Sequence, residues 1–223
     1  MDERFSLCDY LTVPAGGAGN HLFESEFYKS DCRLNVAAWY PASENSGPGK
    51  RTVIWLQGCR KRCEGCVNPH LHSFTDREWV EVADLAALLL AIKGIEGITV
   101  FGGEPLLQYR ALAPLLGAVK AGGLTVMLYT GFLYEELQAA AASYGAMAEI
   151  LAATDILVDG PYIVTEDHNE MWRGSANQRI LFLSDAYRHY AWVESAHNRD
   201  MAFHYSQDGG YIWLGIQPRR HQI

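Results

Sequence analysis

Three closely spaced cysteines constrain this chain more than any other feature. Cys59, Cys63 and Cys66 follow one another as C-x3-C-x2-C within the stretch 58–74. Neither the helical period of 3.6 residues nor the strand period of two asks for these gaps. A single loop with such gaps can instead wrap its thiolates around one small inorganic body. Since soft thiolates select zinc, copper(I) or iron–sulfur clusters, the sequence predicts a metal centre on this loop.

Two kinds of centre fit the loop. A 4Fe–4S cluster ordinarily takes four cysteines, one for each iron, and the other cysteines, Cys8 and Cys32, lie well upstream. A cluster held by this loop would therefore keep one iron open for a substrate or cosubstrate. The alternative is a Cys3His zinc site, because His70 follows Cys66 as C-x3-H and His72 is also within reach.

Composition and charge exclude several classes of protein. With 223 residues, of which 49% are hydrophobic, the chain has enough material for one folded domain with a core. A net charge of −8 argues against a non-specific nucleic-acid binder, which normally has a basic surface. No apolar run reaches the length of a membrane span, and the charged N-terminus lacks the apolar stretch of a secretion signal. We therefore expect a cytoplasmic protein that binds neither nucleic acid nor membranes and keeps its cysteines as thiols or ligands.

Runs of β-branched residues alternate with runs rich in leucine and alanine. The expected strands are 33–40, 52–56, 98–101, 124–129, 155–158 and 179–183. The expected helices are 75–93, opened by a capping box of Thr75 and Glu78, then 106–121, and 134–153 with a break at Gly145. Strand–helix alternation at this pitch indicates a parallel sheet with crossover helices. A hairpin is expected after them, with strands 190–193 and 201–205 against 211–216 and a turn at 208–210.

Glycines and polar residues gather where the expected strands end. Because sites in βα folds form at the carboxyl ends of the strands, we expect these residues and the cysteine loop to meet at one mouth. The G-G-E-P stretch at 102–105 could instead form only a tight turn, and Asp159 could be only a turn residue at the end of its strand. The residues in question are Gly102, Gly103, Glu104 and Pro105 after one strand, Thr130 after the next, and Asp159 after the one that follows.

Together these features resemble the radical SAM superfamily. In that family a C-x3-C-x2-C loop holds a 4Fe–4S cluster, the open iron binds S-adenosylmethionine, and a G-G-E-P stretch binds the amino group of this cosubstrate. The resemblance implies an α/β fold, a partial (open) parallel βα barrel with a C-terminal β-hairpin extension. One domain is expected, with an N-terminal extension at 1–32, a core at about 33–183 and a strand extension at about 184–223. The implied cluster ligands are Cys59, Cys63 and Cys66, and the implied cosubstrate contacts are Gly102, Gly103, Glu104 and Pro105.

Five further stretches narrow the resemblance to the anaerobic ribonucleotide reductase activating proteins. In chain order they are G-P-G-K-R at 47–51, C-V-N-P at 66–69, Y-T-G at 129–131 leading to E-E-L at 135–137, D-I-L-V-D-G-P-Y at 155–162, and R-G-S-A-N-Q-R at 173–179. The last stretch either binds the cosubstrate or the partner's glycine loop, or serves only to tie its own loop down. Gly65 stands where many radical SAM proteins carry an aromatic residue near the adenine, so adenine packing must come from elsewhere. The additional residues that the resemblance places at the cosubstrate are Thr130, Asp159, Arg173, Ser175 and Asn177.

The resemblance implies an activating enzyme. Such an enzyme takes an electron from a flavodoxin or ferredoxin, cleaves S-adenosylmethionine to a 5′-deoxyadenosyl radical, and abstracts hydrogen from a glycine of a partner glycyl radical enzyme. A radical SAM enzyme that modifies a peptide or a small metabolite is the alternative within the superfamily, and the lack of additional cysteine-rich cluster domains favours the activase. A zinc-stabilised binding module is the alternative from another class, and it leaves G-G-E-P unexplained.

Overall fold

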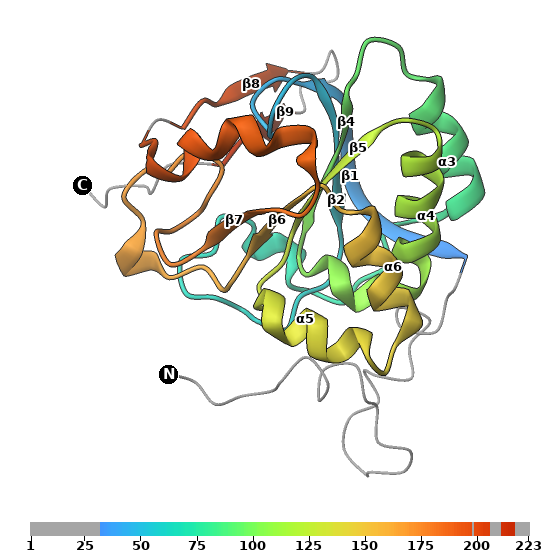
Figure 1. The fold of residues 1–223 in the computed structure, drawn as a ribbon, viewed down its shortest axis with the longest axis horizontal. Helices are drawn as coiled ribbons and strands as arrows, with labels where there is room; N and C mark the ends of the chain where they lie inside the picture. The colour runs from blue at the N-terminus through green and yellow to red at the C-terminus, as the bar shows by residue number, and fades with distance from the viewer. Residues whose placement is uncertain (1–31, 198, 206–210, 217–223) are drawn as a thin grey trace.

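A computed structural model describes residues 32–197, 199–205 and 211–216 of the chain. Its strands are β1 (Arg33–Ser43), β2 (Arg51–Leu56), β3 (Glu78–Glu81), β4 (Gly97–Gly102), β5 (Thr125–Tyr129), β6 (Ile156–Asp159), β7 (Arg179–Phe182), β8 (Ala202–Tyr205) and β9 (Tyr211–Leu214). The first seven form one sheet in the order β3-β1-β2-β4-β5-β6-β7, and β8 and β9 form a separate two-stranded sheet (Figure 1).

The centre of the large sheet is parallel and its edges are antiparallel. β2, β4, β5 and β6 run parallel to one another, which confirms the open parallel βα architecture. β1 runs antiparallel to β2 and β3, and β7 runs antiparallel to β6. β7 differs from the other βα units because no crossover helix lies between it and β6, and a parallel connection needs such a crossover. The expected C-terminal hairpin is present as β8 and β9.

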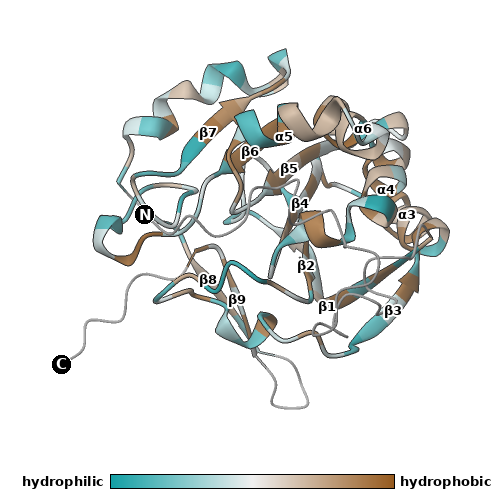
Figure 2. Cartoon of the chain, turned by 90° about the horizontal axis from the view of Figure 1, so that it is seen from below, coloured by the Kyte–Doolittle hydropathy of each residue, from teal (hydrophilic) through white to brown (hydrophobic). Residues whose placement is uncertain are grey.

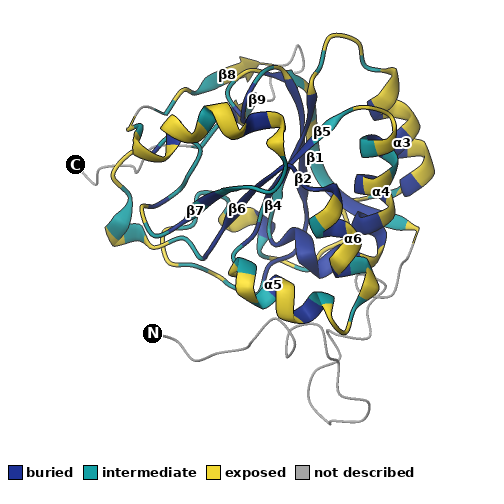
Figure 3. Ribbon diagram, in the orientation of Figure 1, coloured by how far each residue is buried: buried dark blue, intermediate teal, exposed yellow. Residues whose placement is uncertain are grey.

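In the described ranges, the sheet is accompanied by the α-helices α3 (Val82–Ala91), α4 (Tyr109–Ala121), α5 (Tyr134–Ala141) and α6 (Gly145–Ala153). Figure 1 shows α3, α4 and α6 side by side on one face. On β2, Ile54 and Leu56 join the core under these helices, whereas Val53 and Trp55 belong to a cluster on the other face. All four side chains are buried, as expected for a parallel strand that is covered on both faces. The central strands are accordingly hydrophobic in Figure 2 and buried in Figure 3.

Three expected elements differ from the structure. The helix expected from residue 75 begins only at Val82, because Glu78–Glu81 pair with β1 as strand β3. The capping box is therefore wrong, and the Thr75 hydroxyl lies 3.1 Å from the Ser73 hydroxyl instead. The helix expected at 106–121 is divided into a 3-10 turn, η3 (Pro105–Gln108), and α4, while the break expected at Gly145 is confirmed.

The strand expected at 190–193 is wrong as well. These residues lie inside a 3-10 helix, η5 (Asp185–Ser195), whose first turn is capped by the Ser184 hydroxyl as it accepts a hydrogen bond from the Ala186 amide. Tyr187 and Val193 of η5 are buried in a cluster with Met127, Ile156 and Val158 of the sheet. This packing, rather than the alternation of side chains, determines the conformation of the segment. The turn expected at 208–210 lies outside the described residues.

A buried arginine closes the amino end of the parallel strands. Arg51, the first residue of β2, is fully buried. Its guanidinium donates to the Thr99 hydroxyl (2.9 Å) and to the Ile98 and Thr125 carbonyl oxygens (2.8 and 3.1 Å). Burial lowers the pKa of Arg51, while its contact with Tyr187 acts in the opposite direction. These bonds join the starts of β2, β4 and β5 at the amino end of the sheet.

No helix in the described part of the chain is long and apolar enough to cross a membrane.

Candidate functional site

The loops at the carboxyl ends of the parallel strands surround a cavity of about 150 Å³. β2, β4 and β5 contribute residues, as do Gly160 directly after β6 and the segment around β9. The cysteine loop, Gly102–Pro105 and Thr130 meet here as expected from the sequence, whereas Asp159 does not line the cavity. The lining includes the polar or ionisable side chains of Cys59, Lys61, Cys63, Cys66, Asn68, His72, Glu104, Thr130, Tyr162 and Gln178.

Backbone hydrogen bonds join the two ends of the cysteine loop. The Gly58 amide donates to the Leu71 carbonyl (2.9 Å) and the Cys59 amide to the His72 carbonyl (3.3 Å), so the chain leaves and returns at one point. Between these ends, Gly65 has a positive φ of 70°. A Cβ there would lie 2.8 Å from Val164 Cγ2, which explains glycine at this position.

The electrostatics of the three thiols depend on burial. Burial above all, and then the charge of Glu104, raise the pKa of Cys59 to about 12, although hydrogen bonds from the backbone amides of Arg62 and Lys61 act in the opposite direction. Burial also raises the pKa of Cys63 and of Cys66. A metal cation reverses this preference, because coordination deprotonates a thiol outright. The thiols therefore suit metal ligation better than free thiolate chemistry.

Gly102 and Gly103 bring the end of β4 against the start of the cysteine loop. The Gly103 amide donates to the Leu56 carbonyl (2.8 Å) and the Glu104 amide to the Gly58 carbonyl (2.7 Å). A Cβ on Gly103 would lie 2.1 Å from the Gly58 carbonyl oxygen. Contact between the two loops therefore requires glycine here, whatever the stretch binds.

Glu104 ties the loop after β4 to the loop after β5. Its carboxylate accepts hydrogen bonds from the Leu106 amide (3.1 Å), the Thr130 hydroxyl (2.9 Å) and the Gly131 amide (2.8 Å). Burial raises its pKa, which these donors and the nearby Lys61 counteract. Lys61 in turn places its ammonium group 3.7 Å from the centre of the Phe132 ring. The Glu104 carboxylate thus shares one cavity with the three thiols.

An aromatic layer forms the floor of the cavity. Trp55, Phe101 and Tyr129 come from neighbouring strands, with ring centres 6.0 Å and 4.2 Å apart. None of the three is among the predicted site residues, although each lies near the end of its strand and lines the cavity. Strand periodicity combined with the site at the strand ends would have found them.

Four predicted contacts lie outside the cavity lining. Asp159 is buried, accepts a hydrogen bond from the Tyr134 amide (2.7 Å) and forms an ion pair with Arg179. Ser175 and Asn177 tie their loop to the chain after β6, because the Ile163 amide donates to the Ser175 hydroxyl (3.1 Å) and Asn177 donates to the Pro161 carbonyl (2.7 Å). These contacts are structural, and cosubstrate binding by these residues stays a prediction.

Arg173, the fourth of these residues, also ties loops together. It donates to the Gln178 carbonyl (2.9 Å) and to the Glu194 carbonyl in η5 (2.7 Å). Gln178 itself lines the cavity and donates to the Gly160 carbonyl (2.8 Å).

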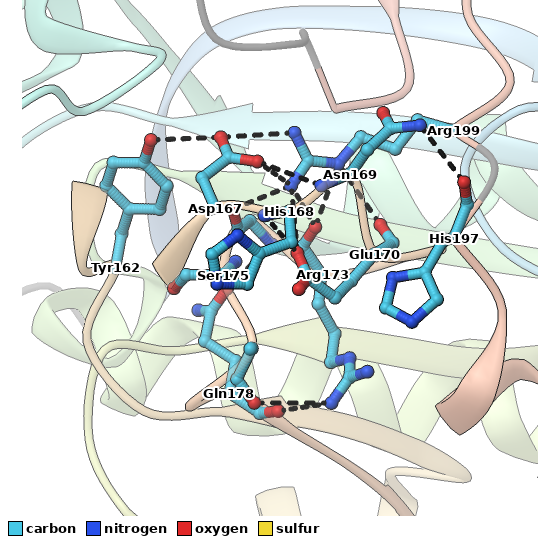
Figure 4. A network of polar contacts seen from close by, with 12 residues as sticks. Tyr162, Asp167, His168, Asn169, Glu170, Arg173, Ser175, Gln178, His197 and Arg199 are labelled. Carbon is cyan, nitrogen blue, oxygen red and sulfur yellow. Dashed lines mark hydrogen bonds and ion pairs between the residues drawn. The ribbon is translucent and has the colours of Figure 1, made fainter. Parts of the chain in front are cut away.

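Arg199, from the C-terminal part of the chain, anchors the loop that carries Tyr162 and Gln178 (Figure 4). Its guanidinium pairs with Asp167 at 2.8 Å and donates to the Arg173 carbonyl at 2.9 Å. Both charged side chains are almost fully buried, with exposed fractions of 2% and 3%. The Tyr162 hydroxyl donates to the same Asp167 carboxylate (3.1 Å), so Arg199 indirectly fixes a residue of the cavity wall.

The donor set fits a 4Fe–4S cluster. Three thiols from one loop face one cavity, and backbone amides of Lys61, Tyr162 and Asn68 donate to their sulfurs, as amides do around iron–sulfur clusters. A zinc site would need several side chains gathered around a single ion. In the ranges that the structure describes, no three His, Cys, Asp or Glu side chains, the three cysteines included, are gathered that closely.

Comparison with known proteins agrees with this geometry. The family of 4Fe–4S single cluster domains matches residues 45–181. The anaerobic ribonucleoside-triphosphate reductase-activating protein of enterobacteria phage T4 is 29% identical over 158 residues, which are 68% of this chain and 96% of that protein. The protein of the same name from Vibrio cholerae is 30% identical over 66% of this chain and 97% of its own length.

A more distant relative broadens the group. The pyruvate formate-lyase-activating enzyme of Clostridium pasteurianum is 33% identical over 117 residues, which cover 50% of this chain and 45% of that enzyme. The cysteines of the family pattern are Cys59, Cys63 and Cys66 here, and a 4Fe–4S cluster is the cofactor of this domain. The chain therefore belongs to the 4Fe–4S single cluster domain family, as a radical SAM enzyme of the glycyl-radical-enzyme activating type.

Proposed function

We propose that this enzyme activates an anaerobic ribonucleoside-triphosphate reductase by removing a hydrogen atom from a glycine of that protein. The names of the relatives matched over 96% and 97% of their own length support this partner. The observation that carries the proposal is the single cavity that Cys59, Cys63 and Cys66 share with Glu104 at the carboxyl ends of the strands.

The cofactor supplies the radical chemistry. When bound, a reduced 4Fe–4S cluster supplies the electron that cleaves S-adenosylmethionine into methionine and a 5′-deoxyadenosyl radical. The role of the chain is to hold and orient the reactants and to exclude water. With three cysteines as ligands, one iron stays available to the cosubstrate. A flavodoxin or ferredoxin is the proposed electron donor, and the reducing cytoplasm is the proposed compartment.

The cosubstrate's ammonium group suits the wall formed by Gly103, Glu104 and Thr130. Glu104 is 1% exposed, and a buried carboxylate attracts an ammonium group far more strongly than one in water. Because the two loop amides and the Thr130 hydroxyl already hold the carboxylate in place, it needs no rearrangement when the cosubstrate binds. The aromatic floor of Trp55, Phe101 and Tyr129 would separate the bound reactants from the interior of the barrel.

Electron paramagnetic resonance tests the proposal. Reconstituted enzyme, S-adenosylmethionine and a reductant are mixed without oxygen with the purified reductase, and the glycyl radical on the reductase is quantified. We expect a stable glycyl radical signal that is absent with Cys63→Ala. If 5′-deoxyadenosine forms but the reductase stays without a radical, the partner is wrong, and other glycyl radical enzymes and peptides become the candidates.

A further inference from the structure

A second cavity, of about 500 Å³, adjoins the cysteine cavity. It lies between β1, the end of the cysteine loop and β9, and we call it the hairpin groove. Its own lining includes Ala37, Ala38, His70, Arg77 and Ile212.

The hairpin groove is continuous with the cysteine cavity. Trp55, Val67, Asn68 and Trp213 line both spaces, so these shared side chains are what lies between the two. A chain lying in the groove is therefore next to the cavity that the three thiols line.

One wall of the groove is an addition to the family domain. The family match ends at residue 181, and β8 and β9 follow it. Leu214 packs with Val53 and Trp55 in one hydrophobic cluster, and the Tyr40 hydroxyl lies 3.3 Å from His204 Nδ1. The hairpin is thus fixed against β1 and β2, where it narrows the approach to the site.

The groove suits an extended polypeptide. Ala37 and Ala38 leave room because their side chains are small, and Ile212 and Trp213 supply apolar surface. The pairing of β1 with β3 covers Arg33–Val36 and ends there, so the edge of β1 from Ala37 onward has no described strand beside it on that side. On its other side β1 pairs with β2, with an irregularity between Val36 and Ala38. An open edge offers backbone donors and acceptors to an added strand.

The charge of the groove differs from that of the chain as a whole. The chain has a net charge of −8 with histidines counted as neutral, but the charged side chain among the described residues that line the groove is that of the exposed Arg77. Burial and the charge of Arg77 lower the pKa of His70 beside it, which favours a neutral imidazole. A partner segment with acidic side chains or free carbonyl groups complements this lining.

We infer that the hairpin groove binds an extended segment of the protein that this enzyme activates and leads its glycine to the cysteine cavity. The inference rests on the proposed function and adds the docking surface to it. Arg77 binds the acidic or carbonyl groups of the segment, and the hairpin holds the segment against β1.

Binding of the purified reductase under anaerobic conditions tests the inference. Arg77→Glu reverses the charge at the rim, and Ala38→Phe fills the groove, while neither residue lines the cysteine cavity. We expect each change to weaken binding by about tenfold or more, as at a typical interface hot spot. The matched control is Arg188→Glu, the same substitution at an exposed arginine outside the groove, and it should bind as the unchanged enzyme does.

A second readout separates this inference from the proposed function. Formation of 5′-deoxyadenosine without the reductase should be the same in all three variants, which also shows that they are folded. If Arg77→Glu and Ala38→Phe bind the reductase within about twofold of the unchanged enzyme, the groove is not the docking surface. If the unchanged enzyme cleaves S-adenosylmethionine but does not bind the reductase, the proposed partner is wrong, and the inferred occupant of the groove is wrong with it.

Discussion

Replacing Arg199 by methionine should destabilise the protein strongly. Arg199 and Asp167 are 2% and 3% exposed and lie 2.8 Å apart, and Glu170 (1% exposed) lies 3.7 Å from the same guanidinium. Removing the arginine leaves two buried carboxylates without their cation, and breaking a buried pair typically costs about 3–5 kcal/mol. With a urea m-value of about 2 kcal/mol/M, the midpoint of unfolding should fall by about 1.5–2.5 M.

Urea unfolding followed by tryptophan fluorescence measures this shift. The matched control is Arg188→Met, which removes an exposed ion pair with Asp185 (68% and 90% exposed) and should cost about 0–1 kcal/mol. Adding Asp167→Leu to Arg199→Met should recover part of the loss, because one of the stranded charges disappears. A midpoint that moves by less than about 0.5 M in Arg199→Met would refute the reasoning, since the pair would then contribute no more than a surface contact.

Three further changes test the site and its surroundings. Glu104→Gln turns one acceptor oxygen toward Gly131 into an amide donor, so the protein should lose about 1–3 kcal/mol in the same urea assay, and an unchanged midpoint would contradict the hydrogen bonds described for this carboxylate. Gly103→Ala places a Cβ 2.1 Å from the Gly58 carbonyl, so anaerobic reconstitution should incorporate less iron than in the unchanged protein, and full iron content would count against the close contact. Arg179 lowers the pKa of Glu135 to about 2. Because the carboxyl pKa is lower in the folded than in the unfolded chain, Glu135 stabilises the fold above its ordinary pKa of about 4.5, and this contribution is lost as the pH falls toward 2. Between these pH values Glu135→Gln should therefore lose less stability than the unchanged protein. Parallel stability curves for the two proteins would disprove the effect.

The sequence predicts the central parallel strands well because they are buried on both faces. Their β-branched and aromatic runs have few other ways to be buried, and glycines or polar residues end them abruptly. The loops that follow were thereby located, and with them the cavity. The second strand of the open barrel shows this most clearly, since Thr52–Leu56 lies between Arg51 at the closed end and the cysteine loop at the open end.

Elements at the edges depend on partners far away in the sequence. The segment 75–78 satisfies a helix-capping pattern, yet four residues of β1 offer Glu78–Glu81 a strand partner, and that tertiary pairing decides the outcome. Likewise, residues 190–193 were expected as a strand, but burial of Tyr187 and Val193, two turns apart on one side of η5, selects the 3-10 helix.

The roles of polar residues in the site were harder to predict than its location. Asp159, Ser175 and Asn177 sit near the strand ends, but their side chains bond to neighbouring backbone and to Arg179. Sequence position alone does not distinguish a ligand contact from a contact that holds a loop. The part played by Trp213 depends on the hairpin folding back over the site, which only the three-dimensional structure reveals.

Mössbauer spectroscopy of protein reconstituted with iron-57 under anaerobic conditions tests the central claim most directly. If three cysteines hold a 4Fe–4S cluster with one open iron, S-adenosylmethionine should change the signal of one iron in four and leave the other three unaltered. The same sample should yield 5′-deoxyadenosine when reduced, and Cys63→Ala should lose both effects. Protein isolated without oxygen that holds stoichiometric zinc, or a cluster whose irons do not respond to the cosubstrate, would contradict the account.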